Sequence, residues 1–455
     1  MENESNPIVG CSNIHSCLVR QKFNGNSVIV KERIQRQDGS IEPKISIYRN
    51  PKHSFYLTKD KFRTHKYSKE YEYLSRLDKF TCYDHEMNQT LAKALGIYTG
   101  GKWVDPSSLY KSPYVYGADI NIEALIKMRY CNKFPDTTIA PVSGFLDIET
   151  SIYTGEVILI SFVENKTVHT AALRAYCYKE EDGKRVPFYE DEIVKLCKEN
   201  LAERTKGIDY TYNFKIFDQE LQLVAWIFDK IHKSHVDFVG IWNINFDIPK
   251  IIGVIEKNNV NPANIFSHPE VPNDLKYFRY VEDKNEHLAH FTLKWHKVLA
   301  SASAQFIDSM ALFSHCRKTA GFRDSYTLES VLQDMLKMGK LPLESGSHTF
   351  MQQHRFREYC VYNAFDVIGL DLLERKNQDI TALVVLSGVS PVLDFNRMTA
   401  RSTNSLYFDL ISKGMVLKSY SRDDDFAKFD KLFPNVGGSV LDPSRITGVG
   451  ISLDY

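Results

Sequence analysis

The sequence lacks an excess of charge of either sign, because its 57 lysine and arginine residues are balanced by 57 aspartate and glutamate residues. A balanced chain has no overall field that attracts a polyanion, so a surface for nucleic acid has to come from local basic groups. Aromatic residues are plentiful, with 27 phenylalanines and 25 tyrosines, which excludes a chain that is disordered throughout.

Paired cysteines and long apolar runs are also missing. The eight cysteines include no Cys-x-x-Cys pair, so we expect neither a zinc site nor a disulfide framework, and such scattered cysteines are typical of a reducing compartment. The apolar stretch ITALVVLSGV is about half as long as a bilayer requires. The first residues, MENESNPIVG, lack the apolar core of a signal peptide. Together these absences predict a cytoplasmic protein without a membrane segment.

The length and texture of the chain predict several domains. With 455 residues, of which 43% are hydrophobic, the chain is expected to divide into two to four domains. Residues 1–140 are polar and contain short β-like runs, which predicts a β-rich N-terminal domain. Residues 141–378 alternate apolar runs with helical patterns. Residues 379–425 are mixed and are expected to return to the N-terminal domain or to act as a linker, and residues 426–455 begin a further domain.

The pattern of residues 141–378 predicts an α/β domain. Three apolar runs separated by short turns predict an antiparallel meander, and helices that alternate with strands follow. The expected strands are 142–149, 155–163, 168–178, 236–242, 291–300 and 303–313, and the expected helices are 191–203, 218–234, 247–258 and 350–376. This order is that of a ribonuclease-H-like domain with a mixed sheet, which makes the chain α/β in that part and α+β overall.

Three Asp-x-Glu triplets occur in the chain, and they are interpreted differently. DQE at 218–220 begins a helical pattern, so capping explains it, and DHE at 84–86 lies among polar residues and is predicted to be at the surface. Only DIE at 147–149 follows an apolar strand. The alternation of a strand places Asp147 and Glu149 on the same face. Two buried carboxylates require positive charge nearby.

Two further acidic sites accompany the DIE triplet. Asp247 follows the predicted strand 236–242 in GIWNINFDIPK, and Asp366 lies four residues after Tyr362 in YNAFD, so these two share a helix face. The simpler alternatives are that Asp247 caps a helix, and that Tyr362 is a core residue beside a solvated aspartate. Asp366 has apolar neighbours in the sequence, which argues against simple exposure.

A convergence of these carboxylates predicts a two-metal site. Four carboxylates repel one another unless divalent cations lie between them, and oxygen-only ligands suit Mg²⁺ or Mn²⁺. Two such ions about 4 Å apart stabilise the attacking and leaving oxygens of a displacement at phosphorus. A tyrosine hydroxyl can orient the attacking water.

The motifs DIE, NINFD and YNAFD, in this order, resemble the three exonuclease motifs of family B DNA polymerases of the T-even-type bacteriophage kind. The resemblance implies a 3′→5′ proofreading exonuclease that removes nucleotides from DNA. It implies that two Mg²⁺ or Mn²⁺ ions are held by Asp147, Glu149, Asp247 and Asp366. It also implies that Tyr362 positions the water and that Asn243 and Phe246 lie near the single-stranded 3′ end. A phage-encoded chain would work in the cytoplasm of its host cell.

The end of the chain also resembles this family. VGGSVLDPSRITGVGISLDY is similar to the start of the polymerase palm, where Asp454 matches a metal ligand of the polymerase site. The fingers and the second acidic motif of the family do not follow. The expectation is therefore a split or truncated polymerase, in which the palm is incomplete and Asp454 acts only if a second polypeptide completes it.

The resemblance suggests several partners and leaves two other functions open. The partners are DNA as a single-stranded 3′ end or primer–template, the second polypeptide, a sliding clamp, and RNA bound by the N-terminal domain. One alternative is a non-catalytic subunit that binds nucleic acid or assembles a split polymerase. The other is a stand-alone exonuclease.

Overall fold

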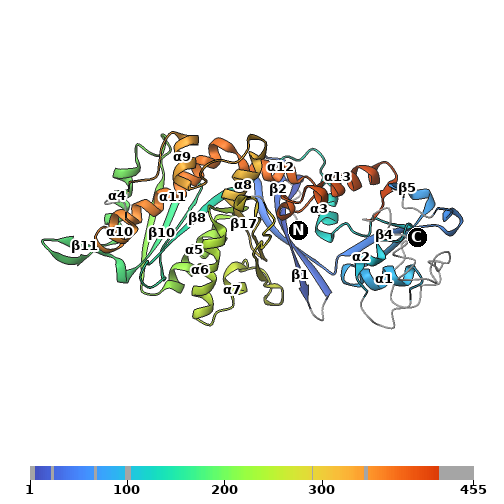
Figure 1. Cartoon of the computed structure of the whole chain (residues 1–455), viewed down its shortest axis with the longest axis horizontal. Helices are drawn as coiled ribbons and strands as arrows, with labels where there is room; N and C mark the ends of the chain where they lie inside the picture. The colour runs from blue at the N-terminus through green and yellow to red at the C-terminus, as the bar shows by residue number, and fades with distance from the viewer. Residues whose placement is uncertain are drawn as a thin grey trace. The chain divides into compact units, whose positions relative to one another are not determined.

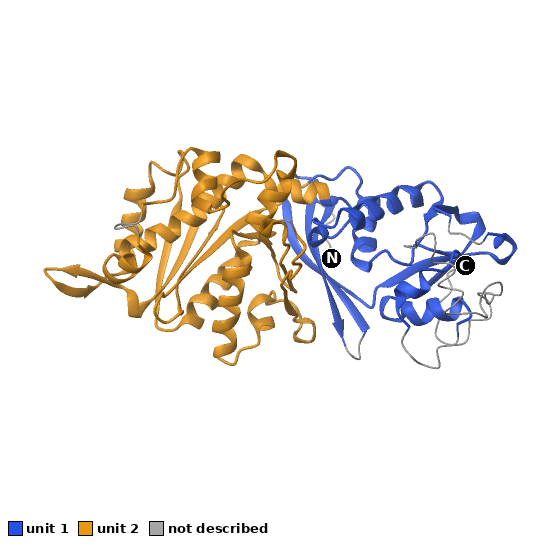
Figure 2. Cartoon of the chain, in the orientation of Figure 1, with its two compact units in different colours: residues 1–138, 387–455 blue, residues 139–386 orange. Residues whose placement is uncertain are grey.

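The computed structural model describes residues 6–21, 25–65, 69–97, 104–288, 290–342 and 347–419. The chain divides into two compact units, shown in different colours in Figure 2. Unit 1 comprises Met1–Thr138 and Ser387–Tyr455, and unit 2 comprises Ile139–Leu386. Among the residues that the structure describes, no helix is both long enough and apolar enough to cross a membrane.

Unit 1 is built on small antiparallel sheets that short helices cover. One sheet has the order β1-β2-β3, a second has the order β6-β4-β7, and β18 pairs with β5. This last pair joins the later part of the unit to the earlier part. The elements are β1 (Ile8–Gln21), β2 (Gly25–Arg36), β3 (Ile41–Arg49), β4 (Lys52–Thr58), β5 (Tyr71–Tyr73), β6 (Leu77–Tyr83), α1 (Met87–Ala94), α2 (Pro106–Leu109), β7 (Val115–Tyr116), α3 (Ile122–Lys133), α13 (Met398–Ser412) and β18 (Met415–Leu417).

Unit 2 is a mixed α/β unit around one six-stranded sheet of order β13-β10-β9-β8-β14-β17. Its strands are β8 (Ser143–Thr150), β9 (Val157–Glu164), β10 (Thr167–Leu173), β13 (Thr211–Phe217), β14 (Phe238–Ile241) and β17 (Gln305–Asp308). Two hairpins lie outside this sheet: β11 (Tyr178–Glu181) with β12 (Lys184–Pro187), and β15 (Phe278–Val281) with β16 (Lys297–Ala300).

Helices cover both faces of the large sheet, as Figure 1 shows: α5 and α6 pack on one face, and α11, flanked by α4 and α9, packs on the other. This arrangement explains why β9 is buried along almost its whole length. The helices are α4 (Glu190–Leu201), α5 (Glu220–Ser234), α6 (Ile244–Lys257), α7 (Pro262–Phe266), α8 (Ser309–Cys316), α9 (Leu328–Leu336), α10 (His348–His354), α11 (Phe356–Asn377) and α12 (Asp379–Ser387).

The predicted meander and the mixed α/β class are confirmed. β8 pairs antiparallel with β9, and β9 pairs antiparallel with β10. The short run at 236–242 is also a buried parallel strand, because β14 lies between β8 and β17 and is parallel to both. β8 therefore has an antiparallel neighbour on one side and a parallel neighbour on the other.

The predictions for unit 2 need correction at several points. The run 303–313 is a strand only as far as Asp308, whose side chain accepts a hydrogen bond from the Ala311 backbone and so caps α8. The predicted helix 350–376 is two helices, because Arg355 leaves the helical conformation and forms a β-bridge with Lys179. The strand β13 was missed, because its pattern is only weakly apolar and it lies at the edge of the sheet.

The DHE triplet of unit 1 is not simply a surface feature. It forms a short 3₁₀ helix between β6 and α1, and the side chain of Asp84 is only 15% exposed. Two hydrogen bonds hold this carboxylate, from the Asn26 amide and with the His53 ring. Polar neighbours in the sequence concealed this burial, because the partners come from β2 and β4.

Gly240 allows β14 to pack closely against β8. A Cβ atom at this position would lie 2.5 Å from the Ser309 Oγ and 2.7 Å from the ring of Phe145. We expect Gly240→Ala to lower the free energy of unfolding by about 1–3 kcal/mol, because the packed core cannot accommodate the methyl group. Urea unfolding monitored by circular dichroism measures this change.

The control is Gly253→Ala in α6, where no described atom lies within 4 Å of the added Cβ. This exposed helical position should gain about 0.5–1 kcal/mol from the same substitution. Equal effects of the two substitutions would contradict the packing assigned to Gly240.

Candidate metal centre

Strand β8 carries the two carboxylates of the DIE triplet to one face of the sheet. The first half of the strand is buried, and the side chains alternate, so Asp147 and Glu149 lie on one face and buried Ile148 on the other. A register shift between Glu149 and Thr150 ends the regular pairing with β9 directly after these residues. The sequence therefore brings two acids to the end of a core strand.

Helix α11 faces these two carboxylates with a stripe of polar side chains. Tyr359 donates a hydrogen bond of 2.5 Å from its hydroxyl to Glu149 Oε2, and Asn363 donates one of 2.7 Å from its amide to Asp147 Oδ2. Tyr362 and Asp366 lie on the same stripe, at the i+3 and i+7 positions relative to Tyr359. α11 is buried on nearly all sides, so it is a core helix.

Three carboxylates meet between β8 and α11. Asp147, Glu149 and Asp366 each place one oxygen within 4.8 Å of the others. Asp366 is buried, and its Oδ1 has no hydrogen-bond partner among the described residues. A buried carboxylate oxygen without a partner is costly unless a cation or a proton meets it. The donor set consists only of oxygen, so it fits Mg²⁺ or Mn²⁺.

Asp247 lies near these three carboxylates but is not one of the group whose oxygens meet. It is buried in the first turn of α6, which begins at Ile244, so it is not the cap of that helix. Its oxygens are not among those that meet within 4.8 Å. Its charge nevertheless helps to raise the pKa of Asp147, and burial, followed by the charges of Glu149 and Asp308, raises the pKa of Asp247. Asp247 is thus a fourth acid near the group.

Burial and mutual repulsion both raise the pKa values of the acids of this site. Burial, followed by the charges of Asp366, Asp247 and Glu149, raises the pKa of Asp147 well above its usual range. Burial is also the main cause that raises the pKa of Glu149 to about 7 and that of Asp366 to about 6. The site therefore holds either protons or cations.

Lys340 is the one cation that the structure places against these acids within the described part of the chain. Its Nζ lies 2.5 Å from Asp366 Oδ2 and donates a hydrogen bond of 3.1 Å to the Tyr362 hydroxyl. Burial disfavours the charged lysine, but Asp366 and Asp147 outweigh burial and raise its pKa. Sequence reasoning gave Lys340 no role, and a lone lysine between Gly339 and Leu341 offers little signal.

The other predicted residues take different positions. Tyr362 is buried beside Lys340. Asn243 and Phe246 are exposed at the start of α6, and Lys250 lies 5.7 Å from the centre of the Phe246 ring. Asp454 lies outside the described residues. A further acid that was missed, Asp308, is buried at the end of β17, and burial raises its pKa to about 7.

Comparisons of the chain with protein-family models and with curated proteins find no match. The chemistry of the site is therefore inferred from its own residues.

The pKa values of the acids predict how stability depends on pH. Glu149 and Asp366 have raised pKa values in the folded chain, so the folded state retains protons that the unfolded chain has lost. This stabilisation is complete below about pH 4 and is lost as the pH rises through 6 to 7. We expect the cation-free chain to become less stable over this range, and Mn²⁺ to restore stability most strongly above pH 7, where its ligands are deprotonated.

Thermal unfolding with and without Mn²⁺, measured across this pH range, tests the prediction. The double variant Asp147→Ala/Glu149→Ala serves as the control and should lose most of the response to Mn²⁺. A stabilisation by Mn²⁺ that is independent of pH, or one that persists in the double variant, would contradict the assignment.

Removal of the lysine charge is expected to destabilise the cation-free site. Lys340→Met leaves Asp366 and Asp147 without their nearest cation, which should cost roughly 2–3 kcal/mol of unfolding free energy above pH 7. The matched control is Lys337→Met, because the Lys337 side chain is 80% exposed and should contribute little. Chemical unfolding of both variants in EDTA provides the comparison. If the two variants were equally stable, Lys340 would not be the counter-ion of the acids.

Proposed function

We propose that unit 2 is a metal-dependent 3′→5′ exonuclease that removes nucleotides from DNA ends. The observation that carries this proposal is the meeting of Asp147, Glu149 and Asp366, with Asp247 nearby, at the end of β8 and on one stripe of α11. These are the acids of the three motifs that resemble the exonuclease motifs of family B DNA polymerases. Residues far apart in the chain thus form one oxygen-rich site.

The sheet supports a ribonuclease-H-like fold for this unit. β8, β9 and β10 form an antiparallel meander, and β14 and β17 are added in parallel beside β8. The site lies at the end of the first strand of the meander, next to the parallel strand β14. This order supports the fold that the alternation of strands and helices predicted.

In the proposed reaction Asp147, Glu149 and Asp366 would hold the divalent cations, and Asp247 is available to complete the set. Bound divalent cations supply Lewis-acid stabilisation of the charge that develops on the phosphate. Tyr359 and Asn363 fix the orientations of Glu149 and Asp147 through their hydrogen bonds. Such fixed ligands lower the cost of assembling the site.

The side chains at the rim would orient the substrate. The Tyr362 hydroxyl already accepts a hydrogen bond from Lys340, so it retains its own hydrogen for a water or for a phosphate oxygen. Lys340 adds a positive charge beside the acids, which a phosphate oxygen could also contact. The exposed ring of Phe246, with Lys250 beside it, suits contact with a terminal base.

The second candidate is a non-catalytic subunit that binds nucleic acid or serves assembly. The ion pair between Lys340 and Asp366 favours it, since a lysine can neutralise part of the acid charge without any divalent cation. The wider expectations, namely a polymerase completed by a second polypeptide, a sliding clamp and RNA as further partners, and a cytoplasmic location, stay predictions.

A degradation assay on the whole chain tests the proposed function. We expect single-stranded DNA labelled at its 5′ end to shorten from the 3′ end with Mg²⁺, and EDTA to stop the reaction. The Asp147→Ala/Glu149→Ala variant should be slower by at least about a hundredfold, because stabilisation of several kcal/mol accompanies the bound cations.

The control variant is Asp191→Ala/Glu199→Ala, which removes two exposed acids from α4 and should leave the rate unchanged. A wild-type chain that binds Mn²⁺ but shortens no DNA would favour the non-catalytic subunit. Shortening that persists in the Asp147→Ala/Glu149→Ala variant would assign the activity to another site.

A further inference from the structure

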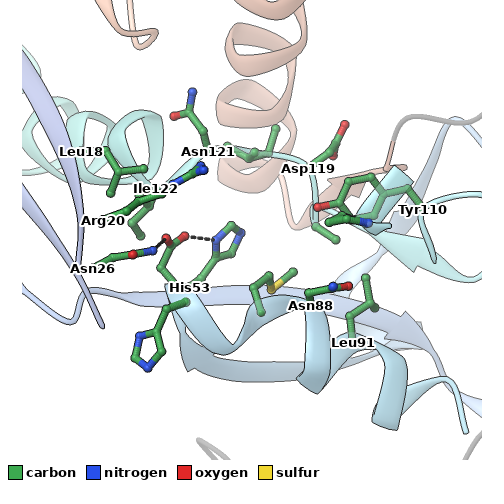
Figure 3. Close-up of a pocket in the computed structure, with 16 residues that line it drawn as sticks. Leu18, Arg20, Asn26, His53, Asn88, Leu91, Tyr110, Asp119, Asn121 and Ile122 are labelled. Atoms are coloured by element: carbon green, nitrogen blue, oxygen red, sulfur yellow. Dashed lines mark hydrogen bonds and ion pairs between the residues drawn. The ribbon is translucent and has the colours of Figure 1, made fainter. Parts of the chain in front are cut away.

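Unit 1 contains a cavity of about 420 Å³ that the proposed exonuclease does not use. Strands β1, β2 and β4, the DHE turn, helices α1 and α2, and the segment before α3 supply its lining, and all of these elements belong to unit 1. A volume of this size suits a small ligand. Figure 3 shows the polar side chains that face this space.

The centre of the cavity is a histidine that a carboxylate orients. His53 Nδ1 lies 3.2 Å from Asp84 Oδ1, and the Asn26 amide donates a hydrogen bond of 2.6 Å to Asp84 Oδ2. Burial opposes ionisation of Asp84, but the hydrogen bonds from His53 and Asn26 hold its pKa below the usual value. Asp84 is therefore a carboxylate, so the His53 Nδ1 carries a proton and donates to it.

In the neutral imidazole, a proton on Nδ1 leaves His53 Nε2 as a hydrogen-bond acceptor. The His53 residue is 3% exposed, and its Nε2 has no hydrogen-bond partner among the described residues. In Figure 3 the ring lies among the labelled lining residues, between Arg20 and Asn88. A buried acceptor that faces a cavity without a partner requires a donor from a ligand or from water.

A second acceptor faces the same cavity. The Asn88 Nδ2 donates to the backbone carbonyl of Val104, which fixes the orientation of the amide, because only the nitrogen can donate. The Asn88 Oδ1 is buried and has no hydrogen-bond partner within the described ranges. His53 Nε2 and Asn88 Oδ1 are thus both acceptors.

The remaining lining is apolar, apart from a few charged groups. Leu18, Leu91 and Ile122 provide flat aliphatic walls, Asp119 adds a carboxylate, and Arg20 is an exposed residue of the lining. Within the described chain, the acids and histidines of this cavity do not form a group of three with ligand atoms close enough for a metal ion. The cavity is therefore built for an organic donor rather than for a cation of the exonuclease type.

We propose that this cavity binds a planar ligand through an amidine-type N–H edge, with His53 Nε2 and Asn88 Oδ1 as the acceptors. Guanidinium and amidinium compounds present two N–H donors along such an edge, and the amino group of a heterocycle such as adenine supplies two N–H bonds from one nitrogen. The aliphatic walls cover the two faces of the planar ligand. The two acceptors favour a ligand whose edge donates hydrogen bonds over one whose edge accepts them. A ligand that presents only acceptors would leave both buried atoms unpaired.

The test compares benzamidine with benzoate, two planar ions of similar shape whose edges respectively donate and accept hydrogen bonds. Isothermal titration of the whole chain measures affinity, and ¹⁵N spectra of the histidine rings report whether His53 Nε2 accepts a hydrogen bond. We expect benzamidine to bind at least about tenfold more tightly than benzoate and to shift the Nε2 signal. Titrations with agmatine, adenosine and inosine distinguish a guanidinium ligand from an amino-bearing heterocycle. Agmatine carries the guanidinium group, and inosine has a carbonyl in place of the amino group of adenosine, so a site for the heterocycle should bind adenosine more tightly than inosine.

Two variants keep the test independent of a folding defect. Asn88→Leu removes one acceptor and should weaken benzamidine about tenfold, and His53→Phe should remove the other acceptor. The matched control is His287→Ala, which removes an exposed histidine of unit 2 and should leave binding unchanged. Equal affinity for benzamidine and benzoate, a cavity filled by water alone, or wild-type affinity in Asn88→Leu would each overturn the proposal.

Discussion

Repulsion among buried carboxylates is the constraint on which the rest of unit 2 depends. Asp147 and Glu149 come from one strand and Asp366 from one helix, and they meet at a partly buried place where Asp366 is buried and Asp147 and Glu149 are half-buried. Ionised acids in such a place lower stability unless a positive charge compensates them. The surrounding structure supplies that compensation in part: Tyr359 and Asn363 donate hydrogen bonds, and Lys340 provides one charge.

Lys340 compensates part of the acid charge of the site when no divalent cation is bound. A single lysine cannot neutralise four acids, so a deficit of positive charge persists above pH 7, when Glu149 and Asp366 are ionised. The same deficit would attract divalent cations, and it is the physical link between the architecture and the proposed hydrolysis of phosphodiesters. The carboxylates that β8 and α11 bring together thus repel one another, and a pair of bound cations would reduce this repulsion.

The sequence predicted those parts of the fold and site whose signal is local. The alternation of β8 identified Asp147 and Glu149, and the four-residue spacing identified Tyr362 with Asp366. It could not predict Lys340, because the lysine reaches the site through tertiary packing rather than through a repeating pattern. The burial of Asp84 was missed for the same reason, since its partners come from other strands. The predicted strand 303–313 ends at Asp308, because the side chain of Asp308 caps α8.

The most direct test of the central claim is the number of Mn²⁺ ions that the cation-free chain binds, counted by electron paramagnetic resonance during a titration above pH 7. We expect two ions to bind to the wild-type chain, and Asp147→Ala/Glu149→Ala to abolish this binding. A wild-type chain that binds no Mn²⁺, or a double variant that binds it unchanged, would show that Lys340 and protons alone compensate the acids, and that these carboxylates do not form a metal centre.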